Sequence, residues 1–112
     1  MAETILGDIW YKGKRRTLVH VTSAGPSSYS SGGFTVTVNS LKQVEKVLSI
    51  SNDGGYKSDA GDASIGTGAN RNVVTVKARE YWYTCGGKDV APEVVAGEDL
   101  SGVTFSLVVI GS

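Results

Sequence analysis

Alternating apolar and polar residues in three stretches of the chain predict β-strands. Residues 34–38 and 74–79 each place an apolar side chain at every second position, and residues 103–110 begin with the same pattern. Successive side chains of a strand point to opposite faces, so each stretch has one face suited to a core. The last stretch is also apolar on its second face, at Val108 and Ile110. We expect both of its faces to be covered.

The N-terminal part of the chain predicts a β-hairpin. Residues 17–22 form a short alternating run, and residues 8–11 form a second one. The segment between them, residues 12–14, contains a glycine and suits a tight turn. We expect residues 1–33 to include this hairpin, either as an accessory arm or as part of the sheet.

Residues 40–51 combine two patterns. Leu41 and its apolar successors have helical spacing, and Ser40 with Gln43 matches a capping box. A helix of about eight residues is marginal on its own, and the later residues alternate as in a strand. The prediction is one helical turn at residues 40–43 followed by a strand at residues 44–51.

The composition favours an all-β fold. Valine, isoleucine and threonine supply about a quarter of the 112 residues, and their branched side chains suit a pleated sheet. Two segments rich in glycine, serine or aspartate, residues 23–33 and 52–72, predict loops between the strands. Residues 1–112 therefore predict a single β domain of about 7–8 strands with at most one short helical turn. An antiparallel β-sandwich, a jelly roll and a small barrel all satisfy this pattern.

Charge and composition exclude several functional classes. Eleven Lys and Arg balance eleven Asp and Glu. Acidic residues elsewhere in the chain offset the positive charge of the basic cluster at residues 12–16, so we expect no nucleic-acid partner. No apolar run reaches the length of a membrane-spanning helix, and the first residues lack the features of a signal peptide. We expect a protein made in a cytoplasm, with no membrane partner. A lone cysteine excludes an internal disulfide and a cysteine zinc site.

Candidate reactive side chains are few. The single histidine, His20, alternates with apolar neighbours on its strand and favours a structural role. Cys85 has no strong local activator of its thiol. Asp53, Asp59 and Asp62 lie in the second loop, where they could surround calcium, but their spacing matches no calcium loop and favours solvated turns. We expect no catalytic residue, no cofactor site and no metal site, and therefore no enzyme.

The aromatic residues are the strongest functional signal. The run of residues 74–79 continues as a predicted strand through Tyr83, and five of the nine aromatic residues fall on this strand and on the strand at residues 8–11. They are Trp10, Tyr11, Tyr81, Trp82 and Tyr83. Aromatic side chains on both faces of a strand cannot all enter one core, so we predict that these five form an interface. A subunit interface and a sugar-stacking surface both fit this composition. A core large enough to enclose most of the rings is a third interpretation.

The C-terminal half resembles small virion structural proteins of bacteriophages and archaeal viruses. The resemblance covers roughly residues 34–112, and three segments carry it: Asn72-Val-Val-Thr-Val-Lys77, Val95-Ala-Gly-Glu-Asp-Leu-Ser-Gly-Val-Thr-Phe105 and the closing Ile110-Gly111. It implies a non-enzymatic capsid decoration or cement protein, made in the host cytoplasm and located in the virion. The implied partners are sister copies, with a homotrimer favoured, and the shell of the major capsid protein.

Two other functions remain open at this point. A carbohydrate- or ligand-binding β-sandwich module would stack a sugar on Trp10 or on residues 81–83 and bond its hydroxyls from the loops. A tail-tube or baseplate component would be structural but would form rings in another part of the virion.

Overall fold

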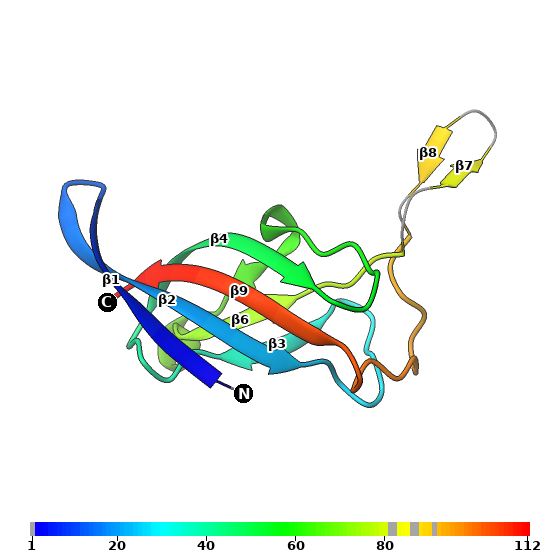
Figure 1. The fold of residues 1–112 in the computed structure, drawn as a ribbon, viewed down its shortest axis with the longest axis horizontal. Helices are drawn as coiled ribbons and strands as arrows, with labels where there is room; N and C mark the ends of the chain where they lie inside the picture. The colour runs from blue at the N-terminus through cyan, green and yellow to red at the C-terminus, as the bar shows by residue number, and fades with distance from the viewer. Residues whose placement is uncertain (1, 81–82, 86–87, 91) are drawn as a thin grey trace.

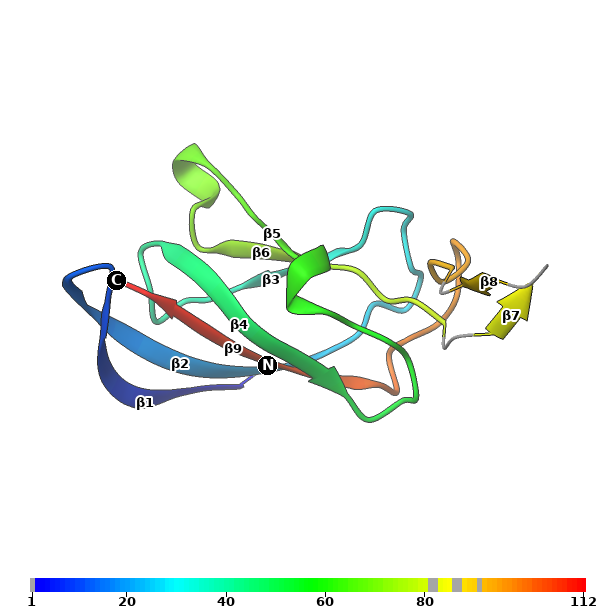
Figure 2. The same ribbon diagram turned by 90° about the horizontal axis from the view of Figure 1, so that it is seen from above.

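The computed structural model describes residues 2–80 and 92–112, and the backbone of residues 83–85 and 88–90. Two antiparallel sheets lie face to face in a sandwich-like arrangement (Figures 1 and 2). The larger sheet has the order β1-β2-β9-β4, with bounds β1 Ala2–Tyr11, β2 Lys14–Ala24, β9 Thr104–Gly111 and β4 Val44–Asn52. The smaller sheet has the order β3-β6-β5, with bounds β3 Phe34–Thr37, β6 Val73–Val76 and β5 Ser64–Ile65.

The all-β prediction is confirmed, with differences in detail. The described residues contain no α-helix, but they contain two 3-10 turns rather than at most one helical turn, η1 Ala60–Asp62 and η2 Gly68–Asn70. Both turns lie in the second predicted loop. No helix within the described ranges has the length and apolarity needed to cross a membrane.

The helical turn predicted at residues 40–43 is wrong, whereas the strand predicted after it is β4. The backbone N–H groups of Lys42 and Gln43 donate to the carbonyl oxygen of Ser112, at 2.8 and 3.1 Å. Those of Asn39 and Ser40 donate to the Glu3 carboxylate, both at 2.8 Å. These long-range bonds take the donors that a local capping box would have organised.

The core lies between the two sheets. Phe105 on β9 is fully buried, and its ring meets that of Phe34 on β3 edge to face, with centroids 4.9 Å apart. Alternate residues of β2, β9 and β6 complete this core from both sheets: Val19, Val21, Leu107, Val109, Val74 and Val76. Ile110, on the opposite face of β9, is also fully buried, which confirms the expectation for that strand.

Beyond β6 the chain leaves the smaller sheet. The alternating run predicted through residue 79 ends as a strand at Val76, and Arg79 then forms isolated bridges with Lys57 and Glu93. The next elements, β7 Tyr83–Cys85 and β8 Lys88–Val90, pair only with each other among the described strands. Their hairpin projects from one end of the sandwich (Figure 1).

Candidate functional site

The β1–β2 hairpin extends past the end of the sandwich. Its two-residue turn has positive φ at both central residues, 52° at Lys12 and 75° at Gly13, which is the type I′ geometry that suits a twisted hairpin. Pairing of β2 with β9 begins only at Thr17, opposite Gly111. Residues 8–16 therefore form an arm that pairs only within the hairpin, called the hairpin arm below (Figure 1).

Strand β1 is an open edge of the larger sheet. It pairs with β2 on one side, and no described strand pairs with its other side. Gly7, at φ 138°, lies at a break in register after Ile5 that divides β1 into two paired segments. Along this edge four large apolar side chains are exposed, with Asp8 as the one exposed charge of β1, which is unusual because open edges normally carry several charges or proline. The four apolar side chains are Ile5, Leu6, Ile9 and Trp10, with Trp10 76% exposed.

One side of the arm combines the Trp10 ring with charged groups. Asp8, Ile9, Trp10 and Arg15 line a shallow depression of about 240 Å³. Arg15 Nε lies 3.2 Å from Asp8 Oδ2, and both side chains are largely exposed, so the pair adds little stability. The depression offers an aromatic face beside a carboxylate and a guanidinium group.

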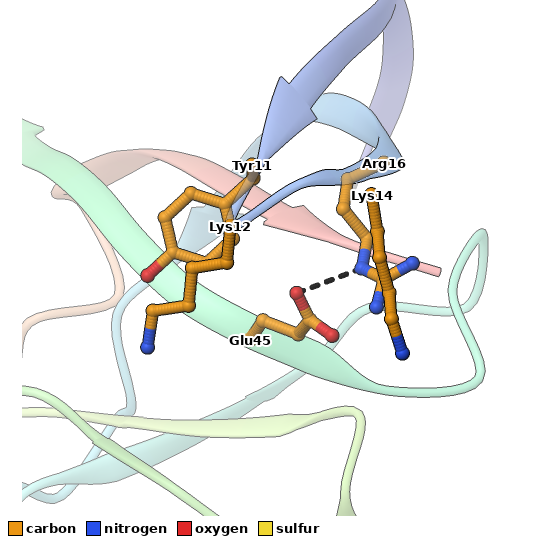
Figure 3. Close-up of a pocket in the computed structure, with 5 residues that line it drawn as sticks. All are labelled: Tyr11, Lys12, Lys14, Arg16 and Glu45. Atoms are coloured by element: carbon orange, nitrogen blue, oxygen red, sulfur yellow. Dashed lines mark ion pairs between the residues drawn. The ribbon is translucent and has the colours of Figure 1, made fainter.

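The other side of the arm is basic and is tied to β4. Tyr11, Lys12, Lys14, Arg16 and Glu45 line a hollow of about 370 Å³ (Figure 3). Arg16 Nε lies 2.8 Å from Glu45 Oε2, and this ion pair lowers the pKa of Glu45. The Lys12 ammonium lies 5.5 Å from the centroid of the Tyr11 ring, within cation–π range. Three cations thus face a single carboxylate in this hollow.

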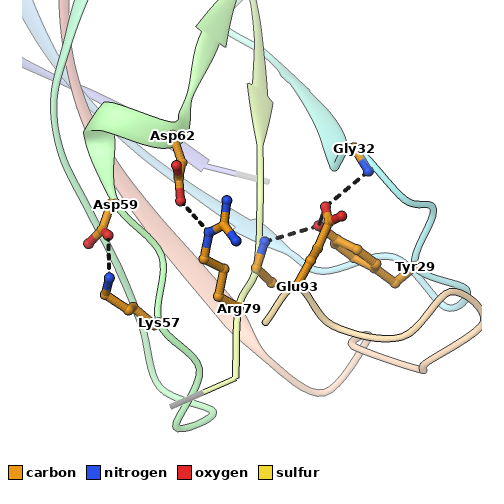
Figure 4. A network of polar contacts seen from close by, with 8 residues as sticks. Tyr29, Gly32, Lys57, Asp59, Asp62, Arg79 and Glu93 are labelled. Carbon is orange, nitrogen blue, oxygen red and sulfur yellow. Dashed lines mark hydrogen bonds and ion pairs between the residues drawn. The ribbon is translucent and has the colours of Figure 1, made fainter. Parts of the chain in front are cut away.

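A second polar cluster, drawn in Figure 4, lies beyond the end of β6, where Arg79 bridges to Lys57 and Glu93. The buried Tyr29 donates its hydroxyl proton to Glu93 Oε2 at 2.7 Å and accepts the Ala78 N–H at 3.1 Å. Glu93 also accepts the Gly32 N–H at 2.9 Å. Burial, and then the bond to Glu93, raises the pKa of Tyr29 to about 12. Because these groups satisfy one another, the cluster holds the fold together and leaves no poised acid or base.

The acidic loop residues do not converge. Asp62 Oδ2 lies 2.7 Å from Arg79 Nε, which lowers the pKa of Asp62, and Asp59 pairs with Lys57 at 3.0 Å (Figure 4). Asp53 accepts the Thr104 N–H at 2.8 Å, at the end of the larger sheet. Within the ranges that the structure describes, no three histidine, cysteine or acidic side chains are grouped so that they could hold a metal ion.

The predicted interface residues fall in different places. Trp10 and Tyr11 lie on the hairpin arm, whereas Tyr81 and Trp82 lie outside the described residues and Tyr83 begins β7. His20 lies on β2 opposite Thr4 and Val108, on the face away from the core, and Cys85 ends β7. The sequence interpretation missed Tyr29, because nothing local in its serine-rich loop indicates a partner 64 residues away.

The hairpin arm is therefore the feature best suited to binding. It offers unpaired strand backbone, an exposed indole ring and a cluster of cations, which support strand pairing, stacking and ion pairing. No protein-family model, no curated protein and no solved structure matches this chain.

Proposed function

We propose that the protein is a non-enzymatic structural protein that assembles through the open edge of β1. The observation that carries this proposal is the exposed apolar side chains along that edge. The other edge of the same sheet, β4, has two breaks in its pairing with β9 and is flanked by η1 and β5. The β4 edge is thus covered by neighbouring elements, whereas β1 has one break in its pairing and no described strand beside its outer edge. An uncovered edge is a template for pairing with another chain.

The assembly that we propose is a viral shell. The protein would add to the major capsid protein as a decoration or cement protein, most simply as a homotrimer, and would reside in the virion. The resemblance of three sequence segments, residues 72–77, 95–105 and 110–111, to virion structural proteins motivates this assignment. An arm carrying tryptophan and arginine, residues enriched at the centres of interfaces, is compatible with it. A reading frame adjacent to major capsid, portal or capsid protease genes is the expected genomic context, and an operon of metabolic enzymes would contradict it.

The edge-strand proposal predicts an oligomer that depends on β1. Replacing Ile5 and Ile9 by lysine should convert an oligomer at micromolar concentration into a monomer, because two charges on an open edge oppose strand pairing. Both side chains are exposed, 61% and 37%, so the free energy of unfolding should change by less than about 1 kcal/mol. Sedimentation velocity measures the first effect and urea denaturation the second.

The matched control is Leu48→Lys on β4, where the side chain is 41% exposed. This variant should remain as oligomeric as the unmodified protein. A monomeric unmodified protein, or an Ile5 and Ile9 variant that still assembles, would refute the role of β1.

One observation favours a second function, a carbohydrate-binding module. The exposed Trp10 ring lies beside Asp8 and Arg15, an arrangement that can stack on a sugar and bond its hydroxyls. Titrating oligosaccharides into a Trp82→Phe variant leaves Trp10 as the only indole, so a fluorescence change would report binding at the arm. The structural proposal expects no such change.

A further inference from the structure

We propose that copies of this chain associate head to tail, with the hairpin arm of one copy docked on the acidic far end of the next. The inference rests on the proposed assembly function and deepens it by naming the two surfaces that meet. It follows from an uneven distribution of charge along a chain whose net charge is zero.

The arm end of the larger sheet is basic. Near the tip, the Arg16 guanidinium is paired with Glu45, and Arg15 pairs with Asp8 at the surface. Further basic residues lie at the same end on β4 and in the loops. Lys46 of β4, for example, pairs with Ile110, which lies next to the last residue of β9. The acidic residues of this end are Glu3, Asp8 and Glu45, and its basic residues are Lys12, Lys14, Arg15, Arg16, Lys42, Lys46 and Arg71.

The far end of the sheet has an acidic surface beside two cations, Lys57 and Arg79, that are ion-paired with Asp59 and Asp62. The loops of residues 23–33 and 91–104 contain no lysine or arginine. Backbone hydrogen bonds bring them together, from Tyr29 N to Glu98 O at 2.8 Å and from Leu100 N to Pro26 O at 2.8 Å. Both Glu98 and Asp99 are exposed there. Asp53 joins them, because its backbone N–H bonds Thr104 O at 3.2 Å.

Each end also carries an exposed apolar side chain. Trp10 on the arm is 76% exposed, and Val95 at the far end is 69% exposed. An apolar centre within a charged rim is the usual composition of a protein interface. The molecule is 47 Å long, so the two ends of one chain cannot meet, and they complement each other only between copies.

A second copy fits the arm better than a nucleic acid does. The arm's cations would favour phosphates, but the remainder of the chain is acidic enough to cancel them, which weakens binding to any long polyanion. A second copy supplies the opposite charge in the right amount. Contacts between unlike surfaces either close into a ring or continue as a filament, and a ring of three would give the proposed trimer.

The test is a charge exchange between two variants. An arm variant, Lys14→Glu with Arg15→Glu, and a far-end variant, Glu98→Lys with Asp99→Lys, should each weaken self-association by about tenfold or more, because each opposes like charges across the contact. Mixing the two variants should restore association in a 1:1 ratio, because each then meets a surface of opposite charge. The mixture should form assemblies with an even number of alternating copies, since a mixed ring of three would retain one contact between like charges. Sedimentation velocity of each variant and of the mixture measures this.

A control variant distinguishes the effect of the charges on the arm from the effect of the net charge. Lys42→Glu with Lys46→Glu changes the net charge by the same amount at the same end but off the arm, and it should associate more tightly than the arm variant. Association of the unmodified protein should also weaken as NaCl rises from about 0.05 to 0.5 M, because salt screens exposed charges. Thermal melting by circular dichroism confirms that each variant is folded.

The remaining outcomes separate this inference from the proposed function. If the unmodified protein assembles but both charge variants assemble equally well, the head-to-tail contact is wrong and assembly through β1 stands. If the unmodified protein is a monomer at every salt concentration, both proposals fail. Unchanged self-association in the arm variant, together with loss of binding to a single-stranded oligonucleotide, would make nucleic acid the partner of the arm.

Discussion

Replacing Phe105 with alanine should lower the free energy of unfolding by about 3–5 kcal/mol. Phe105 is fully buried on β9, between Ser23 of β2 and Asn52 of β4 in the sheet register. Its ring also packs edge to face on Phe34 across the two sheets. Alanine would leave a cavity and remove this contact, and stability of a small domain is only about 5–15 kcal/mol in total. Urea denaturation followed by far-UV circular dichroism measures the loss.

The control for this variant is Leu48→Ala on β4. Leu48 is partly exposed at the edge of the same sheet, and its truncation should cost less than about 1 kcal/mol. Equal losses in the two variants would contradict a core that lies between the sheets at Phe105.

The strands could be predicted because their alternation is local. The buried faces of β2, β3, β4 and β9 are visible in the sequence itself, and the two apolar faces of β9 correctly indicated that Ile110 is covered. The helical turn at residues 40–43 failed for the converse reason. The local sequence fits a helix start, but the backbone N–H groups of this segment bond instead to Ser112 and Glu3, which are distant along the chain.

The order of strands could not be predicted, and the sites depend on it. The basic cluster of the arm is visible in the sequence, but its separation from Glu98 and Asp99 appears only once β9 lies between β2 and β4. The same holds for the polar network, because the partners of Tyr29 come from residues that are distant along the chain. Alternation shows which face of a strand is buried, but it does not show which strand lies beside it.

Replacing Tyr29 with phenylalanine should lower the free energy of unfolding at neutral pH by about 1–3 kcal/mol, because it removes one hydroxyl and leaves the buried Ala78 N–H without its acceptor. Glu93 also loses the 2.7 Å bond that helps to hold its pKa below the ordinary value. The matched control is Tyr11→Phe on the exposed arm, which removes the same hydroxyl and should leave stability nearly unchanged.

The same substitution should change how stability depends on alkaline pH. The pKa of Tyr29 is about 12 in the folded protein, against an ordinary value of 10.0, so the folded chain keeps a proton that the unfolded chain releases between these values. Stability must then fall as pH rises from 10 towards 12, since the state that binds fewer protons gains as protons become scarce. Tyr29→Phe should lose this part of the decline, and Tyr11→Phe should retain it. Denaturation midpoints measured across this pH range would contradict the buried network if the two variants followed the same curve.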